Sequence, residues 1–101
     1  MTAEAALERV KEICMKYHAA RVVLYGSWAK GTATERSDLD IAIAGVSRRD
    51  FMALQEEVDR IPTLRSFDLL NLDTCRNELL RQEVETYGRE ILQEEETWQS
   101  K

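Results

Sequence analysis

The sequence contains few of the residues that mark disordered, fibrous or disulfide-stapled chains. Its 101 residues include one proline, four glycines and two cysteines. So little Pro and Gly, together with 44% hydrophobic residues, is not typical of disordered or collagen-like proteins. The two cysteines are far apart and form no Cys-x-x-Cys pair, so they are expected to be reduced structural thiols. The composition and length therefore predict one ordinary globular domain.

Three further absences narrow the function. A single histidine, His18, makes a metal site of His and Cys ligands a poor hypothesis. No apolar stretch is long enough to span a membrane and the first residues contain no apolar signal core, so we expect no membrane association and a cytoplasmic location. The net charge of -5 disfavours a surface that tracks nucleic-acid phosphates, and we expect no direct nucleic-acid partner.

Hydrophobic periodicity predicts helices packed on a small sheet, in the order α-β-α-β-α-β-α. This pattern favours a two-layer α+β fold with a mixed sheet of about three strands. The helix between the second and third strands predicts a parallel, right-handed crossover, whereas the direction of the first two strands stays open. The expected strands are Arg21–Tyr25, Leu39–Ala44 and Phe67–Leu72; the expected helices are 3–17, Ser27–Lys30, one from an N-cap at Ser47 to Ile61, and one that follows caps at Asp73 and Thr74 and buries Leu80, Val84, Tyr87 and Ile91.

Two aspartates stand at the head of the second expected strand. Side chains alternate along a strand, so Asp38 and Asp40 point to one face. Two neighbouring carboxylates repel each other unless a cation lies between them. Carboxylate oxygens are hard ligands that suit Mg²⁺ or Mn²⁺. Asp68 lies inside the third expected strand and is the best candidate for a third acid, because a bare carboxylate there would be costly.

Glycine and serine follow the first expected strand. Gly26 closes that strand and Ser27 opens a short helix that ends at Gly31. A tight Gly turn into a helix start presents backbone N–H groups to an anion, for which phosphate is the natural ligand. If the first two strands pair antiparallel, this turn faces Asp38 and Asp40. A Gly-Ser turn or an Asp-x-Asp alone is commonly only a turn or a cap, so the prediction depends on their combination.

The stretch "GSWAKGTATERSDLDIAI" resembles the signature of the nucleotidyltransferase superfamily that includes DNA polymerase beta. The family pattern is Gly-Ser, a short helix ending in Gly, and then Ser-Asp-x-Asp. The later segment "ETYGREIL" resembles the closing helix of the minimal nucleotidyltransferases, and the resemblance covers about residues 5 to 92. It implies a nucleotidyltransferase domain over 1–92. The last residues have no periodicity, so a frayed tail is expected over 93–101. The matching residues are Gly26, Ser27, Gly31, Ser37, Asp38 and Asp40, with Asp68 as the later acid.

The resemblance implies an enzyme that transfers a nucleoside monophosphate from an NTP, with ATP as the expected donor, to an acceptor hydroxyl. It implies that Asp38, Asp40 and Asp68 are catalytic residues that hold Mg²⁺ or Mn²⁺. By the same resemblance, Gly26 and Ser27 bind the phosphates, and Gly31 and Ser37 belong to the nucleotide site. Where small members of the family often carry a basic residue, this chain has Trp28, and Lys30 is expected to supply the missing charge.

The resemblance also suggests what accepts the nucleotide. Minimal nucleotidyltransferases are typically paired, as antitoxins, with a helical HEPN-domain protein, and some transfer AMP onto a tyrosine of that partner. Such a partner is expected here, with a homodimer left open. The alternatives are a binding module that neutralises a partner by contact alone, and a transferase that resembles the antibiotic-modifying members. Trp28 and Trp98 are hard to place in the core; Trp28 is interpreted either as an interface anchor or as a cover for the sheet edge.

Overall fold

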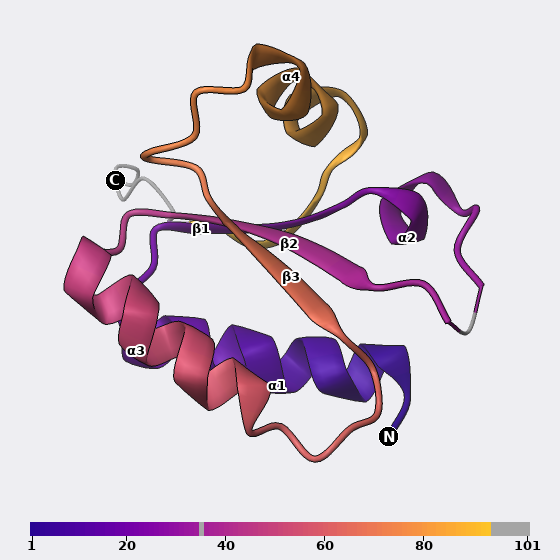
Figure 1. Ribbon diagram of the computed structural model, residues 1–101, viewed down its shortest axis with the longest axis horizontal. Helices are drawn as coiled ribbons and strands as arrows, with labels where there is room; N and C mark the ends of the chain where they lie inside the picture. The colour runs from indigo at the N-terminus through magenta and orange to yellow at the C-terminus, as the bar shows by residue number, and fades with distance from the viewer. Residues whose placement is uncertain (35, 94–101) are drawn as a thin grey trace, which may run out of the picture.

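A computed structural model describes residues 1–34 and 36–93. It contains α1 (Ala3–Lys16), β1 (Arg21–Tyr25), α2 (Ser27–Lys30), β2 (Leu39–Ala44), α3 (Arg48–Asp59), β3 (Phe67–Asn71), α4 (Glu78–Tyr87) and β4 (Arg89–Gln93). The strands form one twisted sheet in the order β3-β2-β1-β4, with α1 and α3 below it and α4 above it in Figure 1. The mixed α+β class is confirmed.

The strand directions bring the ends of β1 and β2 together. β1 and β2 pair antiparallel, with Tyr25 opposite Asp40. β2 and β3 pair parallel, as the intervening α3 predicted, and Asp40 lies opposite Asp68. β4 pairs antiparallel with the free edge of β1. The turn after β1 therefore lies at the same end of the sheet as the first residues of β2 and β3.

Each face of the sheet is covered by its own helices. On one face, Leu39, Ile41 and Ile43 pack into a buried cluster with residues of α1 and α3. On the other, Val23, Tyr25 and Ala42 pack with Val84 of α4. The alternation along β2 thus divides its side chains between two cores. The arrangement differs from the expected two layers, because α4 covers the second face.

The expected last helix is wrong in its bounds. α4 is capped by Asn77, whose side chain accepts the backbone N–H of Leu80 at 3.1 Å, and not by Asp73 or Thr74. The helix ends at Tyr87, which is 55% exposed rather than buried. A side chain at Gly88 would place its Cβ 2.4 Å from a methyl group of Val23, so only glycine lets the chain turn here against the sheet.

Residues after Gly88 form a strand where the sequence predicted helix. Ile91 lies in β4 and not on α4, so the sheet has four strands rather than three. The run is short and its apolar residues, Ile91 and Leu92, are adjacent, so neither a helical nor a strand period is resolved over it. The end of the expected domain at residue 92 and the expected tail stay predictions, and residues 94–101, with Trp98, lie outside the described residues.

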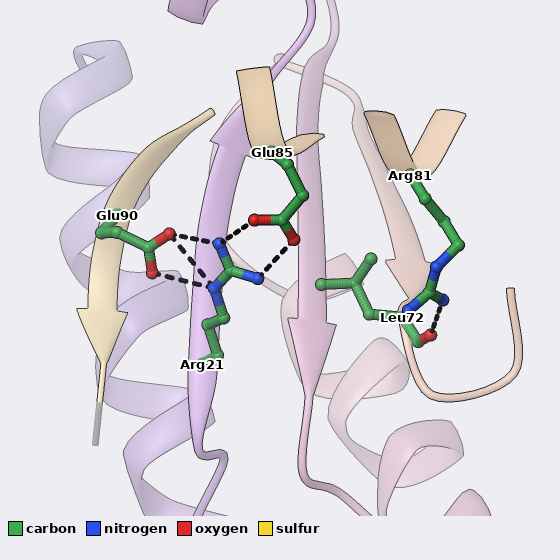
Figure 2. Close-up of polar contacts among 5 residues, drawn as sticks. All are labelled: Arg21, Leu72, Arg81, Glu85 and Glu90. Atoms are coloured by element: carbon green, nitrogen blue, oxygen red, sulfur yellow. Dashed lines mark hydrogen bonds and ion pairs between the residues drawn. The ribbon is translucent and has the colours of Figure 1, made fainter. Parts of the chain in front are cut away.

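Arg21 ties α4 and β4 to the central strand, as Figure 2 shows. Its guanidinium pairs with Glu85 of α4 at 2.7 Å and with Glu90 of β4 at 2.6 Å. One turn earlier on α4, Arg81 donates to the carbonyl oxygen of Leu72 at 2.6 Å. These contacts fix the position of α4 over the sheet and hence of every side chain that α4 turns toward it.

Replacing Arg21 by alanine is expected to lower the free energy of unfolding by about 1–2 kcal/mol, since the paired carboxylates remain largely exposed to water. The hydrogen bond from Arg21 lowers the pKa of Glu85 below its usual 4.5. The contribution of the pair is therefore present above that value and is lost as the pH falls through the lowered pKa. Urea unfolding at neutral pH and at about pH 3 measures both effects.

The matched control for this prediction is Arg9→Ala on α1. Arg9 pairs with Glu12 at 3.9 Å on an exposed helix face. Its replacement is expected to change stability by less than about 0.5 kcal/mol at either pH. If the free energy of unfolding fell equally in the two variants, Arg21 would not be holding α4 against the sheet.

Within residues 1–34 and 36–93, no helix has the length and hydropathy needed to cross a bilayer.

Candidate active site

The turn after β1 is held by two glycines with left-handed backbone angles. Gly26, with φ 72°, precedes α2, and its carbonyl oxygen accepts the N–H groups of Ala29 and Lys30 at 3.1 Å each. Gly31, with φ 77°, ends the helix, and the N–H of Thr32 closes the turn on Ser27. No side chain caps the first turn of α2. The N–H groups of Ser27 and Trp28, which start the helix, can therefore bind an anion.

Gly26 lies directly against the carboxylate of Asp40. A Cβ built on Gly26 would come within 2.3 Å of Asp40 Oδ2. Glycine is therefore required twice at this position, for its backbone angle and for the absence of a side chain. The expectation that the phosphate turn faces the aspartates is supported by this contact and by the antiparallel pairing of β1 and β2. A phosphate at the turn would lie beside the carboxylates.

The three predicted acids come together at one end of the sheet. Asp40 and Asp68 are partners in the parallel register of β2 and β3, so their side chains leave the sheet on the same face, about 5 Å apart at the backbone. Asp38 precedes β2 and lies two residues before Asp40, a spacing that places both residues on the same face of an extended chain. Asp38 and Asp68 are exposed and Asp40 is half-buried. This face of the sheet is the one that α4 covers.

Several carboxylates lie close enough at this site to raise the pKa of their neighbours. Burial, followed by the charges of Asp68, Asp38 and Glu83, raises the pKa of Asp40 above its usual range. Burial and the charges of Asp40 and Asp68 raise the pKa of Tyr25 to about 12, so its phenol keeps its proton. An uncompensated carboxylate cluster of this kind is stabilised by a cation.

The donor set fits a hard divalent cation, although the geometry is not that of a finished metal centre. The available ligands are carboxylate oxygens, which Mg²⁺ and Mn²⁺ prefer. In the part of the chain that the structure describes, no three His, Cys, Asp or Glu side chains converge closely enough to form such a centre. The side chains of Asp38, Asp40 and Asp68 would have to close around an ion when it binds.

The other predicted nucleotide residues have partners within the protein. The Ser37 hydroxyl accepts the N–H of Thr34 at 2.9 Å, and the carbonyl oxygen of Ser37 accepts the indole N–H of Trp28 at 3.2 Å. Ser37 therefore shapes the loop that leads to Asp38. Lys30 forms an ion pair with Glu83 of α4, with 3.4 Å between Nζ and Oε1. A cavity of about 570 Å³ lies next to this loop, but Ser37 is the only predicted site residue among those that line it.

Trp28 has contacts inside the protein. Its side chain packs against the cluster formed with α1 and α3, and the guanidinium of Arg65 lies 5.2 Å from the centre of its ring. These contacts favour the interpretation in which Trp28 covers the edge of the sheet, rather than the one in which it anchors a partner.

Glu83 is the residue near the acids that the sequence did not reveal. It reaches the site only because α4 covers the face of the sheet that carries Asp40 and Asp68. Glutamate is common along the exposed positions of α4, and nothing in the pattern distinguishes Glu83 from Glu78 or Glu85.

Comparisons with known proteins find relatives of this chain in sequence and in fold. A family model described as polymerase beta, nucleotidyltransferase, matches residues 8–97. A protein of Methanocaldococcus jannaschii, named as a protein adenylyltransferase, is 30% identical over 70 residues, which make up 69% of this chain. The match spans 57% of the length of that curated relative.

Two solved structures share the fold. A chain from a crystal structure of a toxin–antitoxin with AMP-PNP superposes with a TM-score of 0.68 and 22% identity, over 86% of this chain and 73% of the other. A chain from a structure of a tri-AMPylated HEPN toxin of Shewanella oneidensis in complex with an MNT antitoxin gives 0.65 and 17%, over 91% and 73%. At these identities the likeness shows the fold.

Proposed function

Because the chain belongs to the polymerase beta-like nucleotidyltransferase family, we propose that it transfers a nucleoside monophosphate from an NTP, with ATP as donor, to a hydroxyl group of a partner protein. One observation carries this proposal: the phosphate turn and the acid pair share one site, with Gly26 packed against Asp40 and Asp40 beside Asp68. An anion-binding turn beside crowded carboxylates is suited to a metal–triphosphate complex.

The order of the strands suggests how the substrates lie. The turn after β1, Asp40 on β2 and Asp68 on β3 follow one another across the sheet. Gly26 and Ser27 would hold the outer phosphates and Lys30 would neutralise them. Asp38, Asp40 and Asp68 would hold Mg²⁺ or Mn²⁺, which when bound balances charge on the entering and leaving oxygens. The acceptor would then approach from the β3 side.

In the proposed reaction the acceptor oxygen bonds to the α-phosphorus as the bond to the pyrophosphate oxygen breaks. Asp68 lies on the acceptor side and would take the proton that the hydroxyl loses. Asp40, packed against the phosphate turn, would keep the α-phosphate in line. Pyrophosphate leaves past Lys30, and the acceptor keeps the nucleoside monophosphate as a phosphodiester.

The partner proposed is a small helical HEPN-domain toxin, with this chain as its antitoxin. The relatives support this proposal: one is named for protein adenylylation, and a solved structure with the same fold contains an AMPylated HEPN toxin with its MNT antitoxin. The net charge of -5 also favours a protein partner over a nucleic acid. A cytoplasmic location stays a prediction from the sequence.

Co-expression with the protein encoded by the adjacent gene tests this function. We expect the intact mass of that protein to rise by one or more nucleoside monophosphate units, and not to rise with Asp38→Asn. A stable complex without added mass would favour a binding module. No complex and no added mass would exclude a protein acceptor encoded there and favour a small-molecule acceptor.

A further inference from the structure

Lys30 is held by two residues of α4. Its ammonium group lies 3.4 Å from Glu83 Oε1 and 5.0 Å from the centre of the Tyr87 ring. Glu83 and Tyr87 are one helical turn apart, so both lie on one face of α4. The side chains of Lys30 and Glu83 are 37% and 32% exposed. Lys30, which is expected to bind phosphate, therefore already has an anionic partner in Glu83.

Glu83 also acts on the acids. Its charge contributes to the raised pKa of Asp40 and of Tyr25, so its carboxylate lies within electrostatic range of both. The position of Glu83 is set by the fold, because Arg21 and Arg81 fix α4 to the sheet. The carboxylate of Glu83 therefore pairs with Lys30 and also lies within electrostatic range of Asp40.

The charges of this arrangement do not favour a bare nucleotide. Among the described residues, Asp38, Asp40, Asp68 and Glu83 contribute four carboxylates and Lys30 contributes one ammonium group. A metal-free triphosphate that drew Lys30 away would leave Glu83 unpaired beside the aspartates and would add its own negative charge. With a divalent cation held by the aspartates that repulsion would be smaller, and Lys30 could turn from Glu83 to the phosphates.

We propose that Glu83 makes nucleotide binding depend on the metal, so that the site selects the metal–nucleotide complex over the free nucleotide. This inference rests on the proposed function and assigns Glu83 a role in specificity, through Lys30, and not in the chemical step. Coupling between two ligands is reciprocal, so the nucleotide must strengthen metal binding by the same factor.

Calorimetry with α,β-methylene-ATP, which cannot be cleaved at the α–β bridge, measures this coupling. In the wild-type protein, Mn²⁺ is expected to strengthen nucleotide binding. Glu83→Gln is expected to tighten nucleotide binding without metal by about fivefold, and to reduce the enhancement of nucleotide binding by Mn²⁺ by the same factor. This factor is at the lower end of typical couplings, because the Lys30–Glu83 pair is partly exposed. Binding of Mn²⁺ alone is expected to weaken, since a negative charge is lost.

The affinities for metal-free nucleotide and for Mn²⁺ are thus expected to change in opposite directions. If Glu83 had only a structural role, Glu83→Gln would weaken the binding of both ligands. Glu78→Gln, which removes the same charge from an exposed position in the first turn of α4, is the matched control and is expected to change neither affinity. In a Lys30→Gln background, Glu83→Gln is expected to tighten nucleotide binding without metal much less.

If Glu83→Gln still bound nucleotide and Mn²⁺ enhanced that binding as much as in the wild-type protein, this inference alone would be overturned. A wild-type protein that binds no nucleotide with Mn²⁺ would overturn the proposed function as well.

Discussion

Replacing Asp68 by asparagine is expected to reduce nucleotidyl transfer by about 10²–10⁴-fold, the range for removing a proton acceptor from an active site. Asparagine keeps the shape of the side chain and loses the charge that would hold a metal and take the acceptor's proton. Asp68 is exposed on β3, so the domain is expected to fold as before. The rate of transfer onto the partner, followed by intact mass, checks the activity, and circular dichroism checks the fold.

Asp73→Asn is the matched control for this prediction. Asp73 also lies near β3, but its carboxylate accepts the backbone N–H of Gly45 at 2.8 Å. The side-chain oxygen of asparagine can accept the same hydrogen bond. Transfer by Asp73→Asn is therefore expected to stay near the wild-type rate. If Asp73→Asn were inactive and Asp68→Asn active, the third acid of the site would be Asp73.

Adding Mg²⁺ together with α,β-methylene-ATP is expected to raise the melting temperature by about 10 °C or more. A ligand that binds only the native state stabilises it, by about 2.7 kcal/mol at a concentration 100 times its dissociation constant. For a domain of this size, 1 kcal/mol corresponds to about 4–8 °C. Thermal unfolding with the metal, with the nucleotide, with both and with EDTA measures the shift.

Asp40→Asn provides the control for the thermal shift. Burial and the neighbouring carboxylates raise the pKa of Asp40, so its ionised form destabilises the native state at neutral pH. Without ligands, the variant is expected to melt at the wild-type temperature or above it. It is also expected to lose most of the shift caused by the metal and the nucleotide. A full shift in Asp40→Asn would place the metal elsewhere.

Much of the fold follows from local sequence signals. Thr2 and Ser47 cap α1 and α3 through their side-chain oxygens, and the cap at Ser47 was predicted from the residue type and the acid that follows it. The strands Arg21–Tyr25 and Leu39–Ala44 have the predicted bounds, because glycines end both runs and the runs are strongly apolar. Capping, turn and burial preferences act over a few residues and can be read without the tertiary structure.

The end of the chain shows where local signals are insufficient. Residues 80–92 have apolar side chains that suit a helix up to Tyr87, and the same period can be extended to Ile91. The structure instead breaks the helix at Gly88, because only there can the backbone approach Val23. β4 forms because the open edge of β1 offers hydrogen-bonding partners. That edge exists only in the assembled sheet, so a short stretch of sequence is not enough to predict β4.

The sequence by itself determined which residues the candidate site contains: a glycine turn, a serine, and three aspartates placed on or just before strands. Their types, their spacing and their alternation along the strands predict binding of phosphate and of a divalent cation. Only the tertiary structure decided that Gly26 touches Asp40, that Asp40 neighbours Asp68, and that α4 brings Glu83 to Lys30. Those contacts join segments that are far apart in the chain, and they depend on strand pairing and helix packing, which the order of the residues specifies only collectively.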